Sequence, residues 1–514
     1  MRRLRPVLAL CLVVLLALSG CGEPEPVPTP TPSPEPSPTQ TPQLPARFSL
    51  GYDPAASLHP ITGESQVNQE LTGLVYQGLY ELDNTFTPQP VLAQSATVSG
   101  DGLVWTFTLK PGAAFSNGTP LTAQHGADSL NAARAAPLYA QRLASVTGAA
   151  AGEDGTLTVT LSAPNGNLPA LLDIPIVLEQ EDGSAPLGTG YYHYEAAGDA
   201  LLLRANPHNA SASVLPYDAI PLAPASDPAG RIAAFDSGGV SAVTTDFTSP
   251  YALGYSSSYE TADFPTTTLL YVGFRASGGM CRSPLVRRAF SLSLDREGAV
   301  RSDLSGHGDP AALPVSPLSG EYSQSAADAL SFDLEQAAAL LEQAGYEKGE
   351  DGLLYQGKAP AEVTLLVNSD NDVRQAIAGR LAQALEELGV TVTVNRLPWS
   401  GYTAALAGGQ FDLYLGEVRL TGDFDPSALL SGGLNYGGFS GGELSALLSD
   451  WRAARGDART RAGEALWTRF AQDAPFAPVC FKRGSLLLRW GMASNLNPTR
   501  ANPYYKMDQW ITAG

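Results

Sequence analysis

One stretch of the sequence has the spacing of a catalytic nucleophile. Gly438-Phe439-Ser440-Gly441-Gly442 fits the Gly-x-Ser-x-Gly pattern, in which a sharp turn from strand to helix exposes the serine of a hydrolase. The pattern lies in a glycine-rich stretch with no strand-like run before it, which favours a loop. Ser369-Asp370-Asn371 resembles a β-lactamase fragment, but no Ser-x-x-Lys accompanies it. We expect no enzyme, and a surface-anchored serine hydrolase using Ser440 stays as an alternative.

Residues that could ligate a metal ion are scattered along the chain. None of the 5 histidines has a second histidine at helical ligand spacing, and no cysteine pair has metal-ligand spacing. We therefore expect no metal site and no cofactor. Cys281 and Cys480 could form one disulfide in an exported protein, or stay as two buried thiols, and their spacing does not decide between the two.

The N-terminus carries the chemistry of a lipid attachment site. Arg2, Arg3 and Arg5 precede an apolar run, 7–18, that is too short to span a bilayer. Leu18-Ser19-Gly20-Cys21 then matches a bacterial lipobox. In such signals the thiol of Cys21 receives a diacylglycerol, and two acyl chains give a stable anchor. We expect a signal peptide at 1–20 and a protein anchored by lipid at the extracytoplasmic face of the cell membrane.

A proline-rich segment follows the predicted anchor. Residues 21–46 are rich in Pro, Thr, Ser and Glu and lack hydrophobic periodicity, so they cannot form a core. We expect a semi-rigid, polyproline-type linker that holds the folded part away from the membrane.

The charge of the chain limits its partners. The formal net charge is -20, and removal of the three leader arginines with the signal makes it -23. This field repels the phosphates of nucleic acid and of anionic lipid, so we expect no nucleic-acid partner.

The elements that must position any site alternate between helix and strand. Apolar spacing predicts a helix over 71–79, and Asp101-Gly102 predicts a hairpin into a strand at 103–109. Ser283-Pro284 predicts the start of a helix that ends near Asp295, after a strand at 269–274.

The C-terminal half shows the same alternation. A helix is predicted over 334–344, followed by a strand at 363–367, a helix at 373–388 and a strand at 390–394. This order predicts parallel strands joined by a right-handed crossover. At 514 residues the chain exceeds one ordinary core, so we expect an α/β protein with two lobes or more.

Four fragments follow one another in a characteristic order: Tyr76-Gln77-Gly78-Leu79, Pro90-Val91-Leu92-Ala93, 101–107 and 115–123. A further fragment combines the strand 269–274 with 283–290. Together these fragments resemble the family 5 extracellular solute-binding proteins of ABC importers. The resemblance implies a two-lobed periplasmic-binding-protein type II fold, with an extra subdomain in the first lobe and a hinge cleft.

The resemblance also implies a division of the chain and a function. The first lobe would span 47–270, with the extra subdomain at about 71–185; the second lobe would span 271–474, and 475–514 would return to the first. The protein would be a monomer that captures oligopeptides or dipeptides and delivers them to an ABC permease and ATPase complex. An oligosaccharide, a nickel chelate or another small solute is the alternative ligand, and a receptor that signals rather than transports is a further alternative.

Candidate ligand-binding residues follow from the positions they share with the family. The loop that enters the first helix lines the cleft in relatives, Trp399 aligns with an aromatic of their side-chain pockets, and Tyr402 follows one turn later. Trp399 and Tyr402 could equally be core residues. Asp423 occupies the place of an aspartate that pairs with the ligand's α-ammonium, although Asp before proline makes Asp425 a good capping residue. Glu417-Val418-Arg419 stand where relatives have a glycine and an aromatic, and Arg275 where they have an asparagine. The full set of candidates is Glu64, Ser65, Gln66, Tyr271, Trp399, Tyr402, Arg419 and Asp423.

Overall fold

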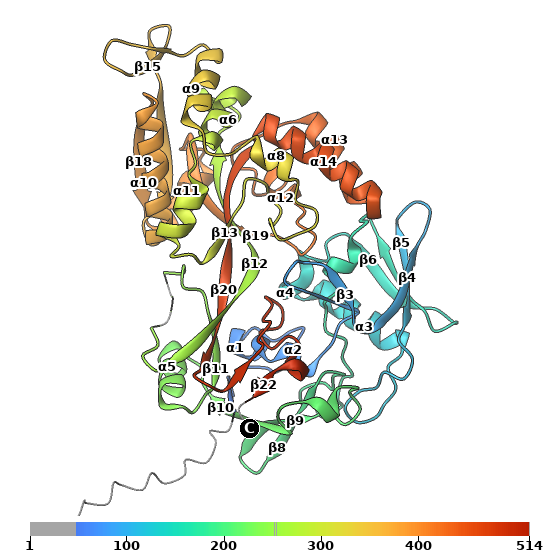
Figure 1. The fold of residues 1–514 in the computed structure, drawn as a ribbon. Coiled ribbons are helices and arrows are strands. Elements are labelled where there is room, and N and C mark those ends of the chain that lie inside the picture. Colours follow the sequence, from blue (N-terminus) through green and yellow to red (C-terminus); the bar gives the residue numbers. More distant parts are fainter. Residues whose placement is uncertain (1–47, 251, 253, 513–514) are drawn as a thin grey trace, which may run out of the picture. The chain divides into compact units, whose positions relative to one another are not determined.

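The computed structural model describes residues 48–250, 252 and 254–512. Figure 1 shows these residues as a mixture of strands and helices. The predicted signal peptide, the lipidated Cys21 and the predicted linker lie outside the described residues, so their assignments stay predictions.

One large mixed sheet runs through the described residues. Its strands follow the spatial order β18-β17-β19-β12-β20-β11-β1-β10-β9-β8, and β13 pairs with β20 off this path. The bounds in that order are Thr391–Leu397, Glu362–Asn368, Leu413–Arg419, Tyr259–Phe274, Phe476–Arg489, Ala242–Thr245, Leu50–Tyr52, Ala219–Pro224, Ala200–Ala205 and Tyr192–Ala197, with β13 at Gly308–Pro310.

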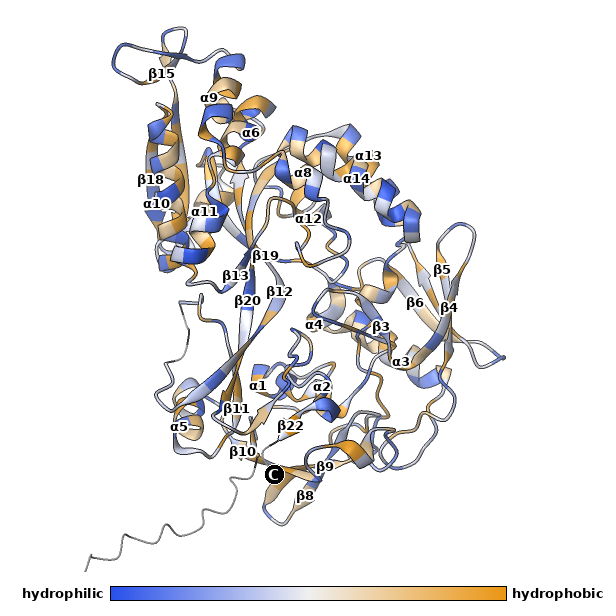
Figure 2. Cartoon of the chain, in the orientation of Figure 1, coloured by the Kyte–Doolittle hydropathy of each residue, from blue (hydrophilic) through white to orange (hydrophobic). Residues whose placement is uncertain are grey.

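Two long antiparallel strands, β12 and β20, join the two ends of this sheet (Figure 1). The C-terminal part of β20 pairs with β11 on its outer side, and residues 480–482 of β20 pair with β13. The C-terminal part of β12 pairs with β19. The register of the pair shifts between Pro265 and Leu269, where Pro265 has no amide N–H to donate to the ladder. Figure 2 shows the middle of β20 as hydrophilic, in keeping with Lys482 and Arg483 at this point of the sequence.

Separate hydrophobic cores lie at the two ends of the β12–β20 pair. The first combines residues of 48–242 with Leu486, Leu488 and residues of 493–510. Two others cover the two faces of the sheet around β19 and β17, and include residues of 477–481 from β20. We call the part with the first core the first lobe, and the part with the other two the second lobe. β20 therefore contributes side chains to the cores of both lobes.

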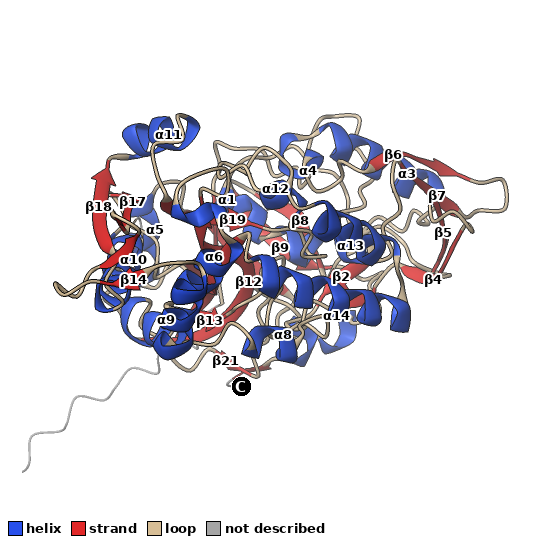
Figure 3. Ribbon diagram, turned by 90° about the horizontal axis from the view of Figure 1, so that it is seen from above, coloured by secondary structure: helices blue, strands red, loops and turns tan. Residues whose placement is uncertain are grey.

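The predicted strand–helix–strand unit of the second lobe is confirmed. α10 (Asp372–Glu387) connects β17 and β18, which pair in parallel with Val363 opposite Val392. Its buried residues Ile377, Leu381 and Leu385 recur four apart and face the sheet, and Figure 3 shows α10 beside these strands. The predicted helix at 334–344 is α9 (Leu334–Gln343).

A four-stranded antiparallel sheet covered by a helix belongs to the first lobe. Its order is β4-β5-β7-β6, at Ala93–Val98, Val104–Leu109, Leu157–Leu161 and Val146–Ala151, and α3 (Ala123–Ala135) packs on it. The predicted hairpin is confirmed: β4 and β5 pair, and Gly102 between them has φ +75°, a conformation that glycine adopts without strain.

Two predicted helix ends are wrong. The helix over 71–79 ends at Val75 as α2 (Thr72–Val75), because the backbone beyond it bonds to other segments: Ile176 N donates to Gln77 O (2.9 Å) and Tyr80 N to Leu172 O (3.2 Å). The helix from Pro284 ends at Leu292 as α6, and Asp295 instead caps the next short helix by accepting a hydrogen bond from Gly298 N.

The remaining elements are short sheets and peripheral helices. The strands are β2 (Tyr80–Leu82), β3 (Pro88–Pro90), β14 (Glu347–Lys348), β15 (Leu354–Gln356), β16 (Ala359–Pro360), β21 (Ala493–Ser494) and β22 (Ile511–Thr512). The helices are α1 (Gln66–Glu70), α4 (Pro137–Ala140), α5 (Pro228–Ser237), α7 (Arg296–Gly298), α8 (Gln324–Asp328), α11 (Trp399–Ala407), α12 (Ser427–Leu430), α13 (Gly442–Ala453) and α14 (Gly456–Asp473), with a π-helical turn at Ala299–Asp303.

Candidate functional site

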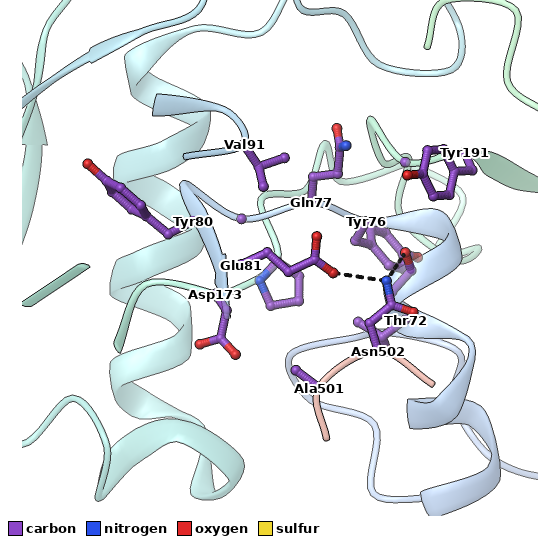
Figure 4. Close-up of a pocket in the computed structure, with 14 residues that line it drawn as sticks. Thr72, Tyr76, Gln77, Tyr80, Glu81, Val91, Asp173, Tyr191, Ala501 and Asn502 are labelled. Carbon is purple, nitrogen blue, oxygen red and sulfur yellow. Dashed lines mark hydrogen bonds between the residues drawn. The ribbon is translucent and has the colours of Figure 1, made fainter. Parts of the chain in front are cut away.

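A small polar cavity lies beside α2 in the first lobe. Its volume accessible to water is about 60 Å³, which is room for roughly five water molecules. Figure 4 shows the Glu81 carboxylate turned toward Asn502, whose side-chain N–H donates to Glu81 Oε1 at 2.9 Å. The lining residues are Thr72, Gly73, Tyr76, Gln77, Gly78, Tyr80, Glu81, Val91, Asp173, Pro175, Gly190, Tyr191, Ala501 and Asn502.

Glu81 is a carboxyl group in this cavity whose pKa is raised. Burial raises its pKa to about 7, the hydrogen bond from Asn502 opposes this shift, and the Asp173 carboxylate adds to it. Asp173 itself forms an ion pair with Arg142. The cavity therefore presents a carboxyl group that changes charge near neutral pH.

A chain of ion pairs spans the crossing of β12 and β20. Lys482 on β20 is buried, and its Nζ lies 2.6 Å from Asp246 Oδ2, which follows β11 in the first lobe. The same Nζ lies 3.6 Å from Glu417 Oε2 on β19, and Glu417 also contacts Arg374 at 2.9 Å. Alternating charges thus balance one another across the boundary between the lobes.

A second polar group in the first lobe involves Glu70 at the end of α1. Its Oε1 accepts hydrogen bonds from Thr244 Oγ1 (2.5 Å) and Arg231 (3.2 Å). Burial raises the pKa of Glu70, while Arg231 and Thr244 lower it. These partners neutralise the carboxylate, so it presents no free charge.

The predicted residues of the entry loop lie at the start of α1. Ser65 is the N-cap residue, but its side chain makes no capping hydrogen bond. Glu64 and Gln66 are exposed, and neither side chain has a hydrogen-bond partner among the described residues. Their role in ligand binding stays a prediction.

The predicted aromatic residues separate into one exposed and two buried side chains. Trp399 and Tyr402 stack on α11 with ring centroids 5.6 Å apart, and Trp399 is 57% exposed, whereas Tyr402 is 3% exposed. Tyr402 donates its hydroxyl proton to Leu415 O, and Tyr271 and Tyr414 have hydroxyl oxygens 3.4 Å apart in the same second-lobe core. Trp399 is accessible to a ligand in this conformation, and Tyr271 and Tyr402 are not.

Asp423 lies at a second contact between the lobes. Its carboxylate is buried and accepts hydrogen bonds from Asn165 Nδ2 of the first lobe (2.9 Å) and from Thr421 Oγ1 (2.5 Å). Asp425 is not the N-cap residue of α12, because Pro426 holds that position; the carboxylate of Asp425 instead accepts from Ser427 N at 2.9 Å and forms the turn before the helix. Pairing of Asp423 with an ammonium group stays a prediction.

Backbone packing closes the same contact. Gly166 N donates to Arg452 O at 2.6 Å, and a Cβ on Gly166 would lie 1.8 Å from Ala454 O. The rings of Phe86 and Phe424 meet edge to face nearby, with centroids 4.9 Å apart. Only glycine fits at position 166 without pushing the two segments apart.

Several residues of these polar groups were not predicted from the sequence. Glu81, Asp173 and Asn502 of the cavity, and Lys482 of the ion-pair chain, come from segments far apart along the chain. No local spacing connects them, although a lysine that directly follows the apolar run 476–481 of β20 is a recognisable signal.

The segment around Ser440 does not have the geometry of a hydrolase. Gly441 is the N-cap residue of α13, and no strand precedes the serine. Ser440 is exposed and has no hydrogen-bond partner within the part of the chain that the structure describes. Cys281 and Cys480 are both free and buried, and burial raises the pKa of each thiol.

Residues 48–250, 252 and 254–512 contain neither a metal-binding cluster nor a helix able to span a membrane. In this part of the chain no three His, Cys, Asp or Glu side chains come together as a metal site. Within the same residues no helix has the length and apolar character needed to cross a membrane.

Curated relatives share moderate sequence similarity with this chain. The oligopeptide-binding protein AppA of Bacillus subtilis is 24% identical over 257 residues, which cover 48% of this chain and 47% of the relative. The glutathione-binding protein GsiB of Pectobacterium atrosepticum is 25% identical over 397 residues, covering 72% of this chain and 76% of the relative. The match to AppA thus spans about half of that protein.

Solved structures share the fold. The unliganded open form of the periplasmic murein tripeptide binding protein MppA has a TM-score of 0.73 at 19% identity, covering 91% of this chain and 97% of that one. NikZ of Campylobacter jejuni, in complex with Ni(L-His), has a TM-score of 0.61 at 18% identity, covering 90% and 99%. The fold is the two-lobed type II fold of periplasmic binding proteins.

The family follows from a match over most of the chain. The sequence model described as "Bacterial extracellular solute-binding proteins, family 5 Middle" matches residues 87–440. Its members are binding proteins and not enzymes, so the hydrolase alternative at Ser440 is dropped. This chain belongs to the family 5 bacterial extracellular solute-binding proteins.

Proposed function

We propose that this protein is the substrate-binding lipoprotein of an ABC importer and captures peptides between its lobes. The family match over residues 87–440 carries the proposal. The names of the relatives, oligopeptide-binding and glutathione-binding, support a peptide or peptide-like solute. In this scheme the lipidated Cys21 holds a monomer at the extracytoplasmic face, where it meets the permease and ATPase complex.

The fold supports capture by closure of one lobe on the other. β12 and β20 cross between the lobes, and the register shift beside Pro265 interrupts their ladder midway. Such an interruption leaves fewer backbone hydrogen bonds to resist bending, which suits a hinge. A ligand that contacts both lobes then stabilises the closed state by its difference in affinity for the two states.

We propose that Trp399 and Asp423 contact the peptide, together with Glu64, Ser65, Gln66 and Arg419. Trp399 already exposes its ring beside the second lobe, and a carboxylate has lone pairs for more than the two donors that Asp423 now contacts. Tyr271 and Tyr402 support the backbone of the same region from within the core.

A ligand screen tests the solute class. Thermal unfolding is measured with trialanine, glutathione, the nickel–histidine complex and maltotriose, because a ligand of the native state raises the melting temperature with its concentration. We expect stabilisation by the peptides. Stabilisation only by nickel–histidine or maltotriose would overturn the peptide assignment and leave the family assignment intact.

Two variants test the residues. Trp399→Ala should weaken trialanine binding while the apo protein loses less than the ~3 kcal/mol typical of a truncated buried tryptophan. Trp490→Ala, which removes a tryptophan that is 73% exposed, is the matched control and should change neither. Wild type should bind trialanine more tightly than N-acetyl-trialanine, and Asp423→Asn should abolish this preference; equal binding of both by wild type would refute the ammonium pairing.

A further inference from the structure

The three most exposed large apolar side chains of the described residues come from three separate segments. Trp490 is 73% exposed, Ile511 65% and Val214 60%. Trp490 follows β20, Ile511 begins β22, and Val214 ends a short helical turn at Ala212–Val214. We call these three residues the exposed apolar group. Single exposed apolar side chains are ordinary, whereas a set of them in one place marks a surface that meets a partner.

Phe48, the first described residue, connects the three segments. Its ring stacks on Tyr217, with centroids 4.6 Å apart, and meets Trp510 edge to face at 6.0 Å. The hydroxyl of Tyr217 donates in turn to Met492 O at 3.5 Å. Each of these three partners lies at most three residues along the chain from one member of the exposed apolar group. The group therefore lies around the point where the folded part of the chain begins.

Rigid backbone holds the members of this group. Met492 N donates to Arg489 O at 3.2 Å and Gly491 has φ +75°, in keeping with a type II turn that has Trp490 at its tip. A Cβ on Gly491 would have no atom within 4 Å, so the tip borders open space. β22 pairs with β21, which places Ile511 opposite Ser494. Side chains on a fixed backbone lose less conformational freedom when they bind a surface.

The segment before Phe48 indicates which surface the exposed apolar group meets. The predicted linker, 21–46, ends two residues before Phe48, and its other end is the cysteine predicted to carry two acyl chains. The exposed apolar group thus lies on the part of the first lobe to which the predicted anchor is attached. Tryptophan is enriched at the interface between membrane and water, because its ring is apolar and its N–H can still donate.

Acidic side chains beside the exposed apolar group select the kind of membrane. Glu260 Oε1 accepts a hydrogen bond from Gly491 N at 3.2 Å, and Asp218 is exposed next to Tyr217. With the formal net charge of -20, these carboxylates repel anionic headgroups. A zwitterionic headgroup instead offers a cationic ammonium group to the carboxylates and an apolar interface to Trp490.

We propose that Val214, Trp490 and Ile511 insert into the interface of a zwitterionic membrane and hold the first lobe against it. This inference rests on the proposed lipoprotein, since the anchor brings this surface and the membrane together. The acyl chains alone leave the folded part free to turn at the end of the linker. Contact through the exposed apolar group is then intramolecular, so a weak affinity is enough to fix the orientation of the lobes relative to the membrane.

The first experiment measures binding to vesicles without the anchor. The full chain with Cys21→Ser is sedimented with vesicles of phosphatidylcholine, and the partition coefficient is compared among further variants in this background. We expect Trp490→Ala to lower it about 10-fold and Ile511→Ser to lower it in the same direction. Phe332→Ala, which removes an exposed aromatic ring between α8 and α9, is the control and should leave it unchanged.

The composition of the vesicles tests the choice of lipid. Phosphatidylglycerol mixed into the vesicles should weaken binding at low salt, and sodium chloride should restore it, because salt screens the repulsion between like charges. Stronger binding to the anionic vesicles would overturn the zwitterionic assignment. Absence of binding to phosphatidylcholine, or equal binding of Trp490→Ala, would overturn the whole inference.

The second experiment examines the lipidated protein in its own orientation. The full chain is reconstituted into phosphatidylcholine vesicles with brominated acyl chains, which quench the fluorescence of a tryptophan that touches them. We expect quenching in wild type and in Trp399→Phe, which removes the exposed tryptophan of the second lobe, and its loss in Trp490→Phe. No quenching in wild type, or equal quenching in all three proteins, would contradict the contact.

Other occupants of this surface give different results. A blue-shifted emission of Trp490 without lipid that is lost when residues 22–46 are removed would assign the surface to the linker. A dimer in sedimentation velocity that Trp490→Ala dissociates would assign it to a second copy of the chain. Each of these results overturns the membrane contact and leaves the lipid anchor intact. If the wild type is not lipidated, but Cys21→Ser binds phosphatidylcholine through Trp490, the contact stands and the lipoprotein proposal fails.

Discussion

Glu81 makes the stability of the first lobe depend on pH in a direction that the structure defines. Its carboxyl group is half-buried in the cavity, and Asn502 donates to it at 2.9 Å. The folded state raises its pKa from 4.5 to about 7. Glu81→Gln keeps the shape of the side chain and an acceptor for Asn502, and removes the titration.

The sign follows from proton binding. Between pH 4.5 and pH 7 the folded state holds the proton on Glu81 more tightly than the unfolded state, so stability falls as pH rises through this window. The full shift corresponds to about 3 kcal/mol. Because water reaches the half-buried carboxylate, we expect Glu81→Gln to be more stable than wild type by about 2 kcal/mol at pH 8. Near pH 4.5 the two should be almost equally stable.

Urea unfolding at both pH values, followed by tryptophan fluorescence, measures this difference. Glu386→Gln is the matched control, because Glu386 is an exposed glutamate on α10 whose side chain has no hydrogen-bond partner among the described residues. Its stability relative to wild type should vary little with pH. The reasoning is refuted if Glu81→Gln shows the same difference from wild type at both pH values, or is less stable than wild type at pH 8.

Three further predictions concern the lipid anchor, the contact between the lobes at Gly166 and the buried side chain of Arg287. Cys21→Ser should move the protein from the membrane to the soluble fraction, and unchanged retention on fractionation would contradict the lipid anchor. Gly166→Ala should lower the free energy of unfolding, measured in urea, by about 1–3 kcal/mol, because the added Cβ would clash with Ala454 O. Gly100→Ala is the control and should be nearly neutral, because no atom lies within 4 Å of its Cβ. Arg287→Met should destabilise the folded protein by about 3 kcal/mol or more in thermal unfolding, because the guanidinium of Arg287 donates to the carbonyls of Cys281, Arg282, Asp473 and Ala474. Arg288→Met, at the half-buried neighbouring position, should lower the stability much less.

Elements built on regular periodicity were predictable from the sequence. β17, α10 and β18 appear where apolar spacing and turn residues predict them, because one face of each element packs on the same sheet. The helix α2 was predicted too long because Gly78 and Leu79 continue the helical spacing of apolar residues. In the folded chain the backbone of these two residues forms hydrogen bonds with 91–93, and the backbone of Gln77 and Tyr80 forms hydrogen bonds with 172–176. Local periodicity carries no information about such distant backbone partners.

The polar groups around the site were less predictable for a related reason. Asn502 follows Asn497-Pro498-Thr499, a turn-like run with no feature of a site. What distinguishes Asn502 is its hydrogen bond of 2.9 Å to Glu81, a residue 421 positions away along the chain. Such a partner becomes visible only when the folded chain has brought the two segments together.

Asp423 shows how contact between the lobes and ligand binding can compete for one group. Its carboxylate now accepts from Asn165 of the first lobe, so the lobes touch at this point without any ligand. If an ammonium group of the peptide takes the place of Asn165, its charged N–H donates to the same carboxylate oxygen in place of the neutral amide N–H. Hydrogen bonds between charged partners are roughly twice as strong as those between neutral ones. The gain on binding is therefore the difference between the two bonds rather than the whole of the new one.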